Sequence, residues 1–533
     1  MKKIVNIVNF IRGVEPRPGR NIDLYQPVRQ QIELLKKTNL KGTFLLQYDA
    51  LLDEKFISMI KECGELCEVG IWFETVQPLV EAVGEQWNGR YSWDWYNDVG
   101  FLIGYEPGVR KKLIDECMRK FYGIFGHYPD SVGSWHIDAV SMAYLSEKYH
   151  ISACCICRDQ VGTDGYTMQG AYYNQAYYPS RANMFSPASD EKMQIAMPVF
   201  RMLGSDPIYA YDYQTVKYGF SGCPTLEPVY VQHGGSQKWC DWFFNEVFSG
   251  AGISFQYAQV GQENSFGWPM MGKGLEYQFE LVKKLYDKKI IEVKTLGESG
   301  KWYKDTFKKT PPSTLVALDD WNEGARKSVW YSSCHYRANL LWENGIVRFR
   351  DMYIFDENYN EKYLTKRCES HACEYRNLPV MDGAIYTDPD KNRYAGIYFK
   401  ENKIDVKWDN IAYIEENNIA VVKLSSGDKT AEIRFYEDGI GIKSNISNLV
   451  LSPEYDRDFV YGKVNKADEQ FANHNNEKTM LTYISEAASE EKLVTFKFDG
   501  IRYGIYAQTG AFDEGYNLQS ENGTIKINVK TGI

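Results

Sequence analysis

Apolar and polar residues follow two alternating patterns along the first third of the chain. Short apolar runs typical of buried strands are separated by longer stretches in which apolar residues recur at the spacing of an amphipathic helix. The expected strands cover residues 4–10, 42–48, 68–73, 131–136 and 151–157, and the expected helices cover residues 26–38, 54–63, 109–125 and 139–148. Strands that alternate with helices in this way predict βαβ units and a parallel sheet.

The same alternation resumes after a long interruption. Further strands are expected at residues 253–260, 290–294 and 314–318, with a helix at 275–288. Because about seven strongly apolar strands suit a closed sheet better than an open one, we predict an α/β fold with a (β/α)7-type parallel barrel over residues 1–343. Residues 158–250 are rich in Tyr, Gly and Pro, and we interpret them as long loops over the barrel mouth.

The pattern changes near residue 345. From there, apolar and polar residues alternate with a period of two, punctuated by turn pairs such as Asp499-Gly500 and Asn522-Gly523. No convincing helical periodicity interrupts this part of the chain. We therefore predict that residues 344–533 form an antiparallel β-sandwich, an accessory domain behind the barrel.

Charge and hydropathy exclude two classes of partner. The formal net charge of −10, from 61 basic and 71 acidic residues, argues against a nucleic-acid-binding surface. No apolar run reaches the roughly 18 residues of a membrane-spanning helix, so we expect no membrane partner. The first residues, broken by Asn6 and Asn9, do not form a typical signal peptide. We expect a cytoplasmic protein, and the sequence leaves a homo-oligomer open.

The eleven cysteines support the same compartment. Several lie inside apolar strand-like runs, as Cys154 and Cys155 do, which fits reduced buried thiols better than a disulfide framework. The motif Cys368-x-x-His371-x-Cys373 offers three close ligands but has no second CxxC pair to complete a zinc site. We therefore predict no metal and no cofactor.

Carboxylates recur where the expected barrel strands end, which is where parallel barrels carry their functional side chains. The polar residues expected there are Arg12, Glu15, Arg17, Asp49, Glu74, His136, Asp138, Arg158, Asp159, Asp164, Glu263, Asp319, Asp320 and Glu323. Each of these residues, taken alone, could have a purely structural role, and Asp138 in particular fits the N-cap of the helix expected at 139–148. As a set, carboxylates gathered at a partly buried rim repel one another and favour a functional site.

Aromatic residues suggest the chemistry of that site. They make up 15% of the chain, with 40 Tyr, 26 Phe and 13 Trp, which indicates either an aromatic-rich core or platforms for flat ligands such as sugar rings. Trp72, Trp135, Trp268 and Trp321 lie beside the strand-end carboxylates. Paired carboxylates with aromatic platforms are typical of glycosidic bond cleavage, in which one acid protonates the leaving oxygen and a second carboxylate attacks or activates water.

Two segments resemble known glycoside hydrolases. Ser134-Trp135-His136-Ile137-Asp138 resembles the W-x-I-D segment of family 38 α-mannosidases, whose Asp is the nucleophile, and family 57 has a comparable Trp before a nucleophilic Glu. Gln262-Glu263-Asn264-Ser265-Phe266-Gly267-Trp268 resembles the region of family 57 that carries the general acid. Both families, like polysaccharide deacetylases, use a seven-stranded (β/α) barrel, and this resemblance implies the same fold over roughly residues 1–340.

The chain departs from these families at their metal sites and at one acid. The first strand ends Asn9-Phe10-Ile11-Arg12 where family 38 has a His-x-Asp zinc pair, and the third strand ends at Glu74 without the histidine pair of the deacetylases. Gly261 occupies the position of the family 57 acid, so that role passes to Glu263 or to the pair Asp319 and Asp320. The resemblance therefore implies a metal-independent enzyme.

Together these observations predict a glycoside hydrolase of retaining mechanism that acts on an oligosaccharide or glycoconjugate. Asp138 is the predicted nucleophile and Glu263 the predicted acid/base. The residues predicted to bind substrate are Arg12, Glu15, Trp72, Glu74, Trp135, His136, Asp164, Trp268, Asp319, Asp320 and Trp321. A deacetylase-like enzyme on the same barrel and a non-catalytic carbohydrate-binding protein remain alternatives.

Overall fold

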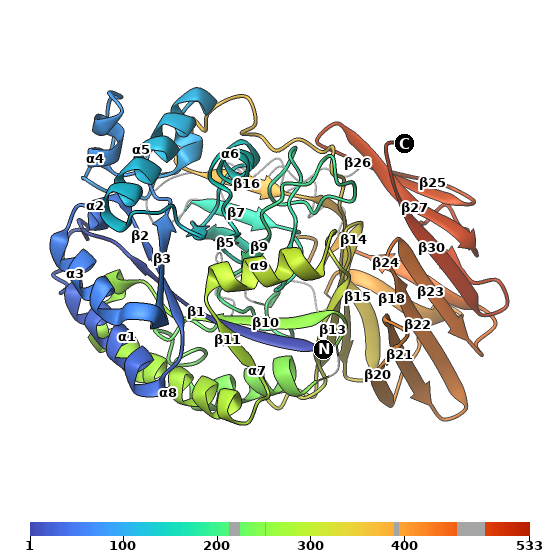
Figure 1. Cartoon of the computed structure of the whole chain (residues 1–533). Helices are drawn as coiled ribbons and strands as arrows, with labels where there is room; N and C mark the ends of the chain where they lie inside the picture. The colour runs from blue at the N-terminus through green and yellow to red at the C-terminus, as the bar shows by residue number, and fades with distance from the viewer. Residues whose placement is uncertain (164, 213–223, 251, 388–393, 456–485) are drawn as a thin grey trace.

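The fold is taken from a computed structural model that describes residues 1–163, 165–212, 224–250, 252–387, 394–455 and 486–533. Asp164, predicted to bind substrate, lies outside the described residues. The first half of the chain is an α/β unit and the second half is built from antiparallel sheets (Figure 1).

A parallel sheet forms the centre of the first half. Strand β1 (Lys2–Ile11) pairs with β10 (Phe255–Val260) and β11 (Glu292–Lys294) along its first residues and with β2 (Gly42–Leu46) along its last. The sheet continues from β2 through β3 (Cys67–Trp72), β4 (Ser131–Gly133), β5 (Ala153–Ile156) and β9 (Val199–Arg201), and ends with the antiparallel β8 (Ala176–Tyr177). The expected strands of this region other than 314–318 are thereby confirmed.

The sheet curves into a nearly closed barrel. The outermost parallel strands, β9 and β10, are not paired with each other, but Phe200 and Tyr257 place their rings 5.0 Å apart across the gap. The longer helices on its outside are α1 (Tyr25–Thr38), α3 (Glu54–Cys63), α5 (Pro107–Phe125), α6 (Ala139–Tyr149), α7 (Gln237–Ser249), α8 (Trp268–Asp287) and α9 (Leu296–Thr306). Shorter segments are α2 (Tyr48–Leu51), α4 (Gln77–Ala82) and the 3-10 turns η1 (Gly64–Leu66), η2 (Leu102–Gly104) and η3 (Asn264–Phe266).

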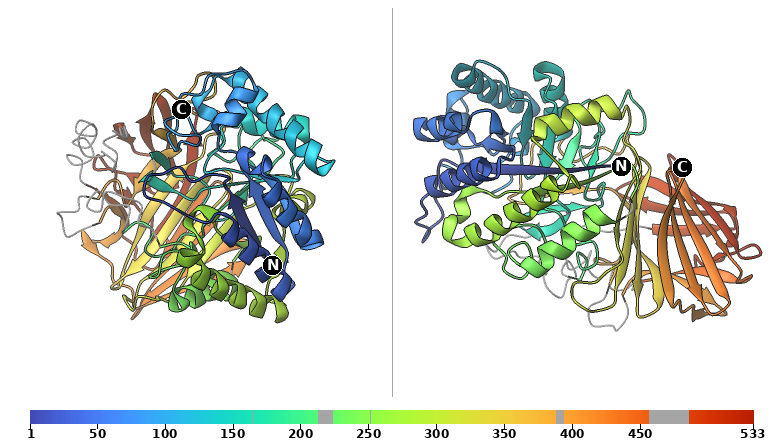
Figure 2. Two further views of the ribbon diagram at one scale, coloured as in Figure 1. Left: turned by 90° about the vertical axis from the view of Figure 1, so that its left-hand side faces the viewer. Right: turned by 60° about the horizontal axis from the view of Figure 1, so that its bottom comes forward.

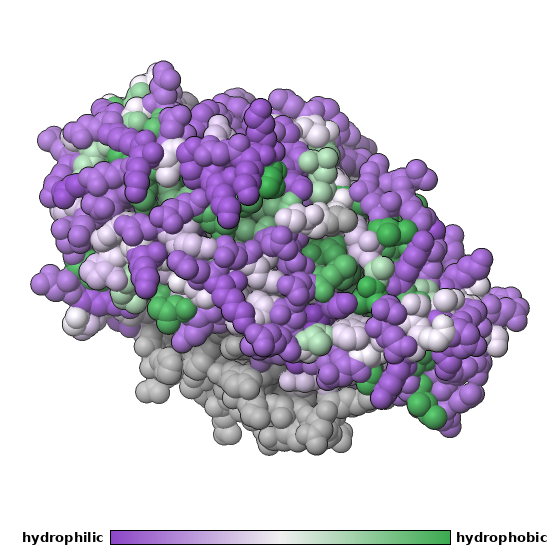
Figure 3. All heavy atoms as spheres, turned by 90° about the horizontal axis from the view of Figure 1, so that it is seen from below, coloured by the Kyte–Doolittle hydropathy of each residue, from purple (hydrophilic) through white to green (hydrophobic). Residues whose placement is uncertain are grey.

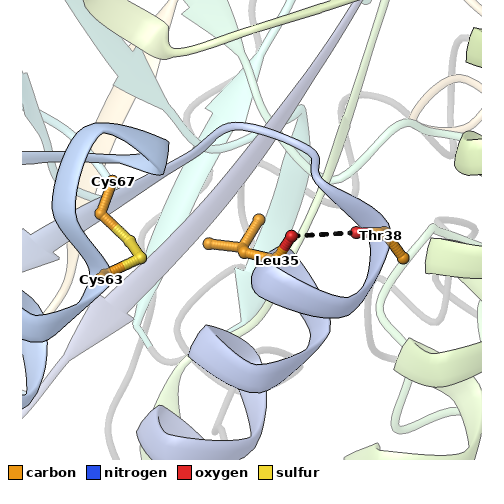
Figure 4. The surroundings of a disulfide bond; sticks show 4 residues. All are labelled: Leu35, Thr38, Cys63 and Cys67. Atoms are coloured by element: carbon orange, nitrogen blue, oxygen red, sulfur yellow. Dashed lines mark hydrogen bonds between the residues drawn. A yellow bond between two sulfur atoms is a disulfide. The ribbon is translucent and has the colours of Figure 1, made fainter.

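A disulfide joins Cys63 at the end of α3 to Cys67 at the start of β3 (Figure 4). The turn between them brings the two Cα atoms to 5.7 Å, within the range that a disulfide spans. This pair departs from the expectation of reduced thiols. The other cysteines that the structure describes are free and buried.

The second half of the chain contains two large antiparallel sheets. The ten-stranded sheet comprises β12 (Ser313–Ala317), β13 (Lys327–Ser332), β14 (Tyr336–Glu343), β15 (Ile346–Ile354), β17 (Leu378–Asp382), β18 (Gly396–Glu401), β19 (Ile404–Asp405), β24 (Leu449–Glu454), β28 (Ala511–Phe512) and β29 (Leu518–Gln519). The eight-stranded sheet comprises β20 (Asn410–Glu416), β21 (Ile419–Ser426), β22 (Lys429–Tyr436), β23 (Gly439–Ser444), β25 (Glu486–Glu490), β26 (Leu493–Phe498), β27 (Ile501–Thr509) and β30 (Thr524–Thr531).

The expectation of a barrel strand at 314–318 was wrong. That run is β12, which pairs antiparallel with β13 in the ten-stranded sheet, so a boundary at residue 343 would cut this sheet in two. A short apolar run does not reveal which sheet it joins, because both faces of β12 are buried. Leu315 packs into the core of the barrel and Val316, on the opposite face, into the core of the sandwich.

The ten-stranded sheet therefore lies between the barrel and the eight-stranded sheet (Figure 2). One segment also returns from it to the barrel. Strand β16 (Cys373–Arg376) pairs in parallel with β7 (Tyr166–Gln169), which pairs in turn with β6 (Gln160–Thr163). The region expected to be long loops, residues 158–250, thus contributes short strands and α7 as well as loops.

No helix in the described part of the chain is both long and apolar enough to cross a membrane. Figure 3 shows one face on which hydrophilic residues predominate and apolar residues form small separate patches.

Candidate active site

Arg12 is the centre of the candidate site. It directly follows β1, and its guanidinium donates to both oxygens of Glu74, from Nε to Oε2 at 2.8 Å and from Nη2 to Oε1 at 2.7 Å. Its Nη1 donates to Oε1 of Glu263 at 2.7 Å. Residues from three strand ends, β1, β3 and β10, are thereby brought together, as the strand-end argument predicts. All three side chains are almost fully buried.

Glu74 acts as the anchor for this arginine. Besides the two hydrogen bonds from Arg12, it accepts one from Gln47 Nε2 at 2.8 Å and one from Trp135 Nε1 at 2.9 Å. Four donors occupy its two oxygens, which leaves little capacity for a substrate. Glu74 was predicted to bind substrate, but these contacts fit a residue that orients Arg12.

Glu263 is bound on one side only. Its Oε1 accepts from Arg12 and from the Ser265 hydroxyl, whereas its Oε2 accepts no hydrogen bond from any residue that the structure describes. Burial raises the pKa of Glu263, and the charge of Arg12 opposes this rise without cancelling it. A buried carboxyl with one oriented oxygen and one available oxygen is suited to proton transfer.

A second buried carboxylate that the sequence did not reveal lies within electrostatic range of Glu263. Glu227, in the described part of the loop after β9, is 8% exposed, and Thr225 Oγ1 donates to its Oε2 at 3.2 Å. Burial raises the pKa of Glu227, Arg158 opposes the rise, and the negative charge of Glu263 adds to it. The pattern around it, Thr-Leu-Glu-Pro in a weakly periodic segment, carries no signal beyond the carboxylate itself.

Aromatic rings surround the cluster around Arg12, and their burial corrects the prediction that Trp72 binds substrate. Trp93 lies under the Arg12 guanidinium, 4.1 Å from ring centre to Cζ. Trp72 is 1% exposed and stacks on Phe10 at 4.1 Å, so it belongs to the core rather than to a sugar platform. Trp135 contacts both rings edge-on and is only partly buried, which keeps it available to a ligand.

Other predicted residues lie in different surroundings. Glu15 is paired with Arg17, and its charge still acts on Arg12. His136 is buried and shares a hydrogen bond with Asn97, at 2.9 Å from Nε2 to Oδ1; burial lowers its pKa to about 3, so it is neutral near pH 7. Trp268 begins α8 and is half-buried.

The segment after β12 forms a separate network. Asp320 accepts from the Tyr209 hydroxyl, and Trp321 Nε1 donates to the buried Asp206 at 2.8 Å, whereas the side chain of Asp319 is exposed. Within the described residues, none of these three side chains forms a hydrogen bond or an ion pair with Arg12 or Glu263. β12 belongs to the antiparallel sheet, and Asp320 and Trp321 instead contact Tyr209 and Asp206 of the segment that follows β9.

The prediction of Asp138 as nucleophile is not supported by its position. Asp138 is completely buried and caps α6, accepting from Ser141 N at 3.0 Å and Ser141 Oγ at 2.7 Å. It also pairs with Arg110 at 2.9 Å, and its negative charge adds to the effect of burial in raising the pKa of the buried Glu361. Because Asp138 is completely buried and its oxygens are occupied by Ser141 and Arg110, it is not open to a substrate.

We expect Asp138→Ala to lower the free energy of unfolding by about 2–3 kcal/mol, because it removes the cap and one charged partner of Arg110. Asp138→Asn keeps the side-chain oxygen and is expected to be milder. Denaturant titration measures both values. The rate per folded molecule of Asp138→Asn should match that of the unchanged protein, and a large loss of rate would restore Asp138 to a catalytic role.

The donor set at this site does not fit a metal ion. The described Asp, Glu, His and Cys side chains that come within mutual ligand range are Cys334, His335 and Glu437, in the sandwich. At the barrel mouth, the guanidinium of Arg12 lies between the carboxylates of Glu74 and Glu263. It supplies the positive charge that a metal ion would provide there. The Cys368 motif is also dispersed, since His371 bonds to Asp98 and Cys373 contacts His136.

No protein-family model and no curated protein matches the chain. Among solved structures, a protein from Parabacteroides distasonis provisionally described as a glycoside hydrolase/deacetylase aligns with a TM-score of 0.54 and 15% identity, over 71% of this chain and 91% of that chain. This chain shares that fold. A polysaccharide deacetylase, also provisionally described, from Mycobacterium smegmatis (TM-score 0.35, 12% identity, 57% and 91% covered) and a 4-alpha-glucanotransferase from Thermococcus litoralis (TM-score 0.27, 8% identity, 99% and 100% covered) align too weakly to carry an argument.

Proposed function

We propose that this chain is a carbohydrate-acting enzyme that hydrolyses a glycosidic bond, with Glu263 as the acid/base and Glu227 as the second carboxylate. One observation carries the proposal: Glu263, held by Arg12 through a single oxygen, keeps its other oxygen available and lies within electrostatic range of a second buried carboxylate, Glu227. Two neighbouring carboxyl groups with different environments are the usual equipment for this reaction. The shared fold with a protein provisionally described as a glycoside hydrolase/deacetylase agrees with it.

The proposed course is retaining. Glu263, protonated, donates its proton to the glycosidic oxygen as the bond from that oxygen to the anomeric carbon breaks. Glu227, in the ionised form that the charge of Arg158 favours, forms a bond to the anomeric carbon. Water, deprotonated by Glu263, then displaces Glu227 and releases the sugar. Arg12 and Ser265 orient Glu263 throughout, and Trp135 offers the sugar an aromatic face.

The deacetylase alternative is weaker for a chemical reason. Deacetylases of this barrel, which the chain resembles, use a histidine-bound metal, and we derive no step through a metal because the carboxylates here surround Arg12. The seven-strand count of the barrel, its relation to families 38 and 57, the cytoplasmic location and the oligomeric state stay predictions. We place the division between the catalytic barrel and the accessory sandwich before β12.

The proposal is tested with a panel of nitrophenyl glycosides and natural oligosaccharides, with NMR of the first product anomer and an assay for released acetate. We expect at least one glycoside to be cleaved with retention. Release of acetate without glycosidic cleavage would establish the deacetylase instead. Binding without any product would leave a carbohydrate-binding protein.

The pH dependence of the rate follows from the raised pKa of Glu263. A general acid must be protonated, so kcat/KM should fall as the pH rises through the pKa of Glu263. Because burial raises that pKa, this decline should lie above the usual range of a glutamate. A pH–rate profile measures it. A decline that begins below that range would contradict the assignment.

A further inference from the structure

Two turns of the sandwich bring a thiol, an imidazole and a carboxylate together, away from the Arg12 cluster. Cys334 and His335 lie in the turn between β13 and β14, and Glu437 lies in the turn between β22 and β23. Their Sγ atom, one ring nitrogen and one carboxylate oxygen all lie within 4.8 Å of one another. Glu437 is 103 residues from Cys334 in the sequence, so no local motif reveals this cluster.

The three donors are of the types that bind zinc in proteins. Zn²⁺ takes thiolate sulfur at about 2.3 Å and imidazole nitrogen or carboxylate oxygen at about 2.0–2.2 Å, usually in a tetrahedron, which sets the donor atoms roughly 3.3–3.7 Å apart. The thiol of Cys334 donates a hydrogen bond to Oε1 of Glu437, with Sγ and Oε1 3.2 Å apart. A zinc ion replaces that proton, which passes to solvent. Rotation of the His335 side chain is enough to bring its nitrogen into range.

Hydrogen bonds already hold the two turns against each other. Ser333 Oγ donates to the backbone carbonyl of Glu437 at 2.7 Å. The hydroxyl of Tyr336 lies 2.9 Å and 2.8 Å from the carbonyl oxygens of Tyr436 and Gly439. The backbone on both sides of the cluster is therefore fixed, and a bound ion has little chain to order, which favours binding.

The cluster combines a protected sulfur with access from solvent. Cys334 is 2% exposed, whereas His335 is half-buried and Glu437 is exposed. The ring of His335 forms no hydrogen bond or ion pair with any residue that the structure describes, so its nitrogens are available. A metal ion can enter from the side of Glu437, and a water molecule can complete the four ligands of a tetrahedral site.

The charges at the cluster suit a divalent cation. A thiolate and a carboxylate balance Zn²⁺, and together they outweigh the single charge of Lys309, which also acts on Cys334. Sulfur and nitrogen donors disfavour Mg²⁺ and Ca²⁺, which prefer oxygen alone. We infer that Cys334, His335 and Glu437 bind a zinc ion that ties the ten-stranded sheet to the eight-stranded sheet at these turns. The inference uses its own residues and does not depend on the proposed function.

The test uses the full chain, stripped of metal with a chelator and then titrated with Zn²⁺ or Co²⁺. We expect one Zn²⁺ per chain by calorimetry and elemental analysis, and Co²⁺ should give the absorption band of a cobalt–thiolate bond. Cys334→Ser should lose that band and bind Zn²⁺ about a hundredfold more weakly, because one ligand is lost. Cys368→Ser is the matched control, because Cys368 belongs to the other Cys and His motif. It should keep both the band and the affinity.

A second variant keeps the test decisive if Cys334→Ser does not fold. Glu437→Gln changes an exposed side chain, so it should fold, keep the cobalt–thiolate band and bind Zn²⁺ about tenfold more weakly. Glu415→Gln, at an exposed residue of β20, is its control and should bind normally. Zn²⁺ should raise the melting temperature of the unchanged protein more than that of either ligand variant, because the metal binds the folded form.

Three results would overturn the inference. They are the absence of stoichiometric Zn²⁺ binding, equal Zn²⁺ affinity of the unchanged protein and the folded ligand variants, and loss of the cobalt–thiolate band in Cys368→Ser. Glu263→Gln should bind Zn²⁺ normally, so a failure of the proposed glycosidase activity and a failure of this metal site give different results.

Discussion

Glu263→Gln is expected to lower kcat/KM by about a thousandfold on the substrate found in the glycoside panel. The amide keeps an oxygen for Arg12 and Ser265 but carries no acidic proton, so the leaving oxygen departs unprotonated. Steady-state kinetics of the purified variant measure the effect. The decline of the rate at high pH should also disappear, because the group that titrates is gone.

The matched control is Glu280→Gln. Glu280 is exposed on α8, a helix that begins just after Glu263, and its replacement should leave the rate unchanged. Circular dichroism and the melting temperature check that Glu263→Gln is folded. A folded Glu263→Gln protein with the rate of the unchanged enzyme would remove Glu263 from the acid role and with it the proposed mechanism.

Arg12→Met is expected to lower the free energy of unfolding by about 3–5 kcal/mol, because Glu74 and Glu263 are left as buried charges without their cation. Urea or guanidinium titration measures the change. Arg119→Met is the control, because Arg119 pairs with Glu116 at the surface and its loss should have no measurable effect.

Two further measurements test whether the repulsion between Glu74 and Glu263 causes the loss of stability in Arg12→Met. The loss of stability in Arg12→Met should become smaller as the pH falls, because the two carboxylates then take up protons and lose their repulsion. Adding Glu74→Gln and Glu263→Gln to Arg12→Met should recover part of the loss. A stable Arg12→Met protein would mean that the guanidinium does not hold the two carboxylates.

Much of the barrel could be predicted from the sequence because its strands are continuous apolar runs. Those runs become β1 to β5 and β10 with their ends displaced by a few residues. The sandwich strands were predicted by their period of two. The partner of β12 could not be predicted, because alternate residues such as Leu315 and Val316 are apolar toward both neighbours and carry no mark of sheet direction.

Part of the candidate site could also be predicted from the sequence. Arg12, Glu74 and Glu263 come together because parallel strands end on one rim. Asp138 also follows a strand, but its side chain pairs with Arg110 in the core. Arg110 lies on the preceding helix α5, and no local sequence pattern connects the two residues. Glu227 lies on a loop whose path is set by tertiary contacts, so residue type alone could not select it.

The segment that returns from the sandwich constrains how this protein can change through evolution. Arg110, on the barrel helix α5, donates to the backbone carbonyls of Tyr363 and Lys366, and β16 extends a small sheet begun by β7. Exchanging the rear half for a foreign module would strip these acceptors from a buried arginine and expose an unpaired strand edge. The two halves should therefore evolve as a unit. Chimeric proteins made by recombination at their junction should be insoluble.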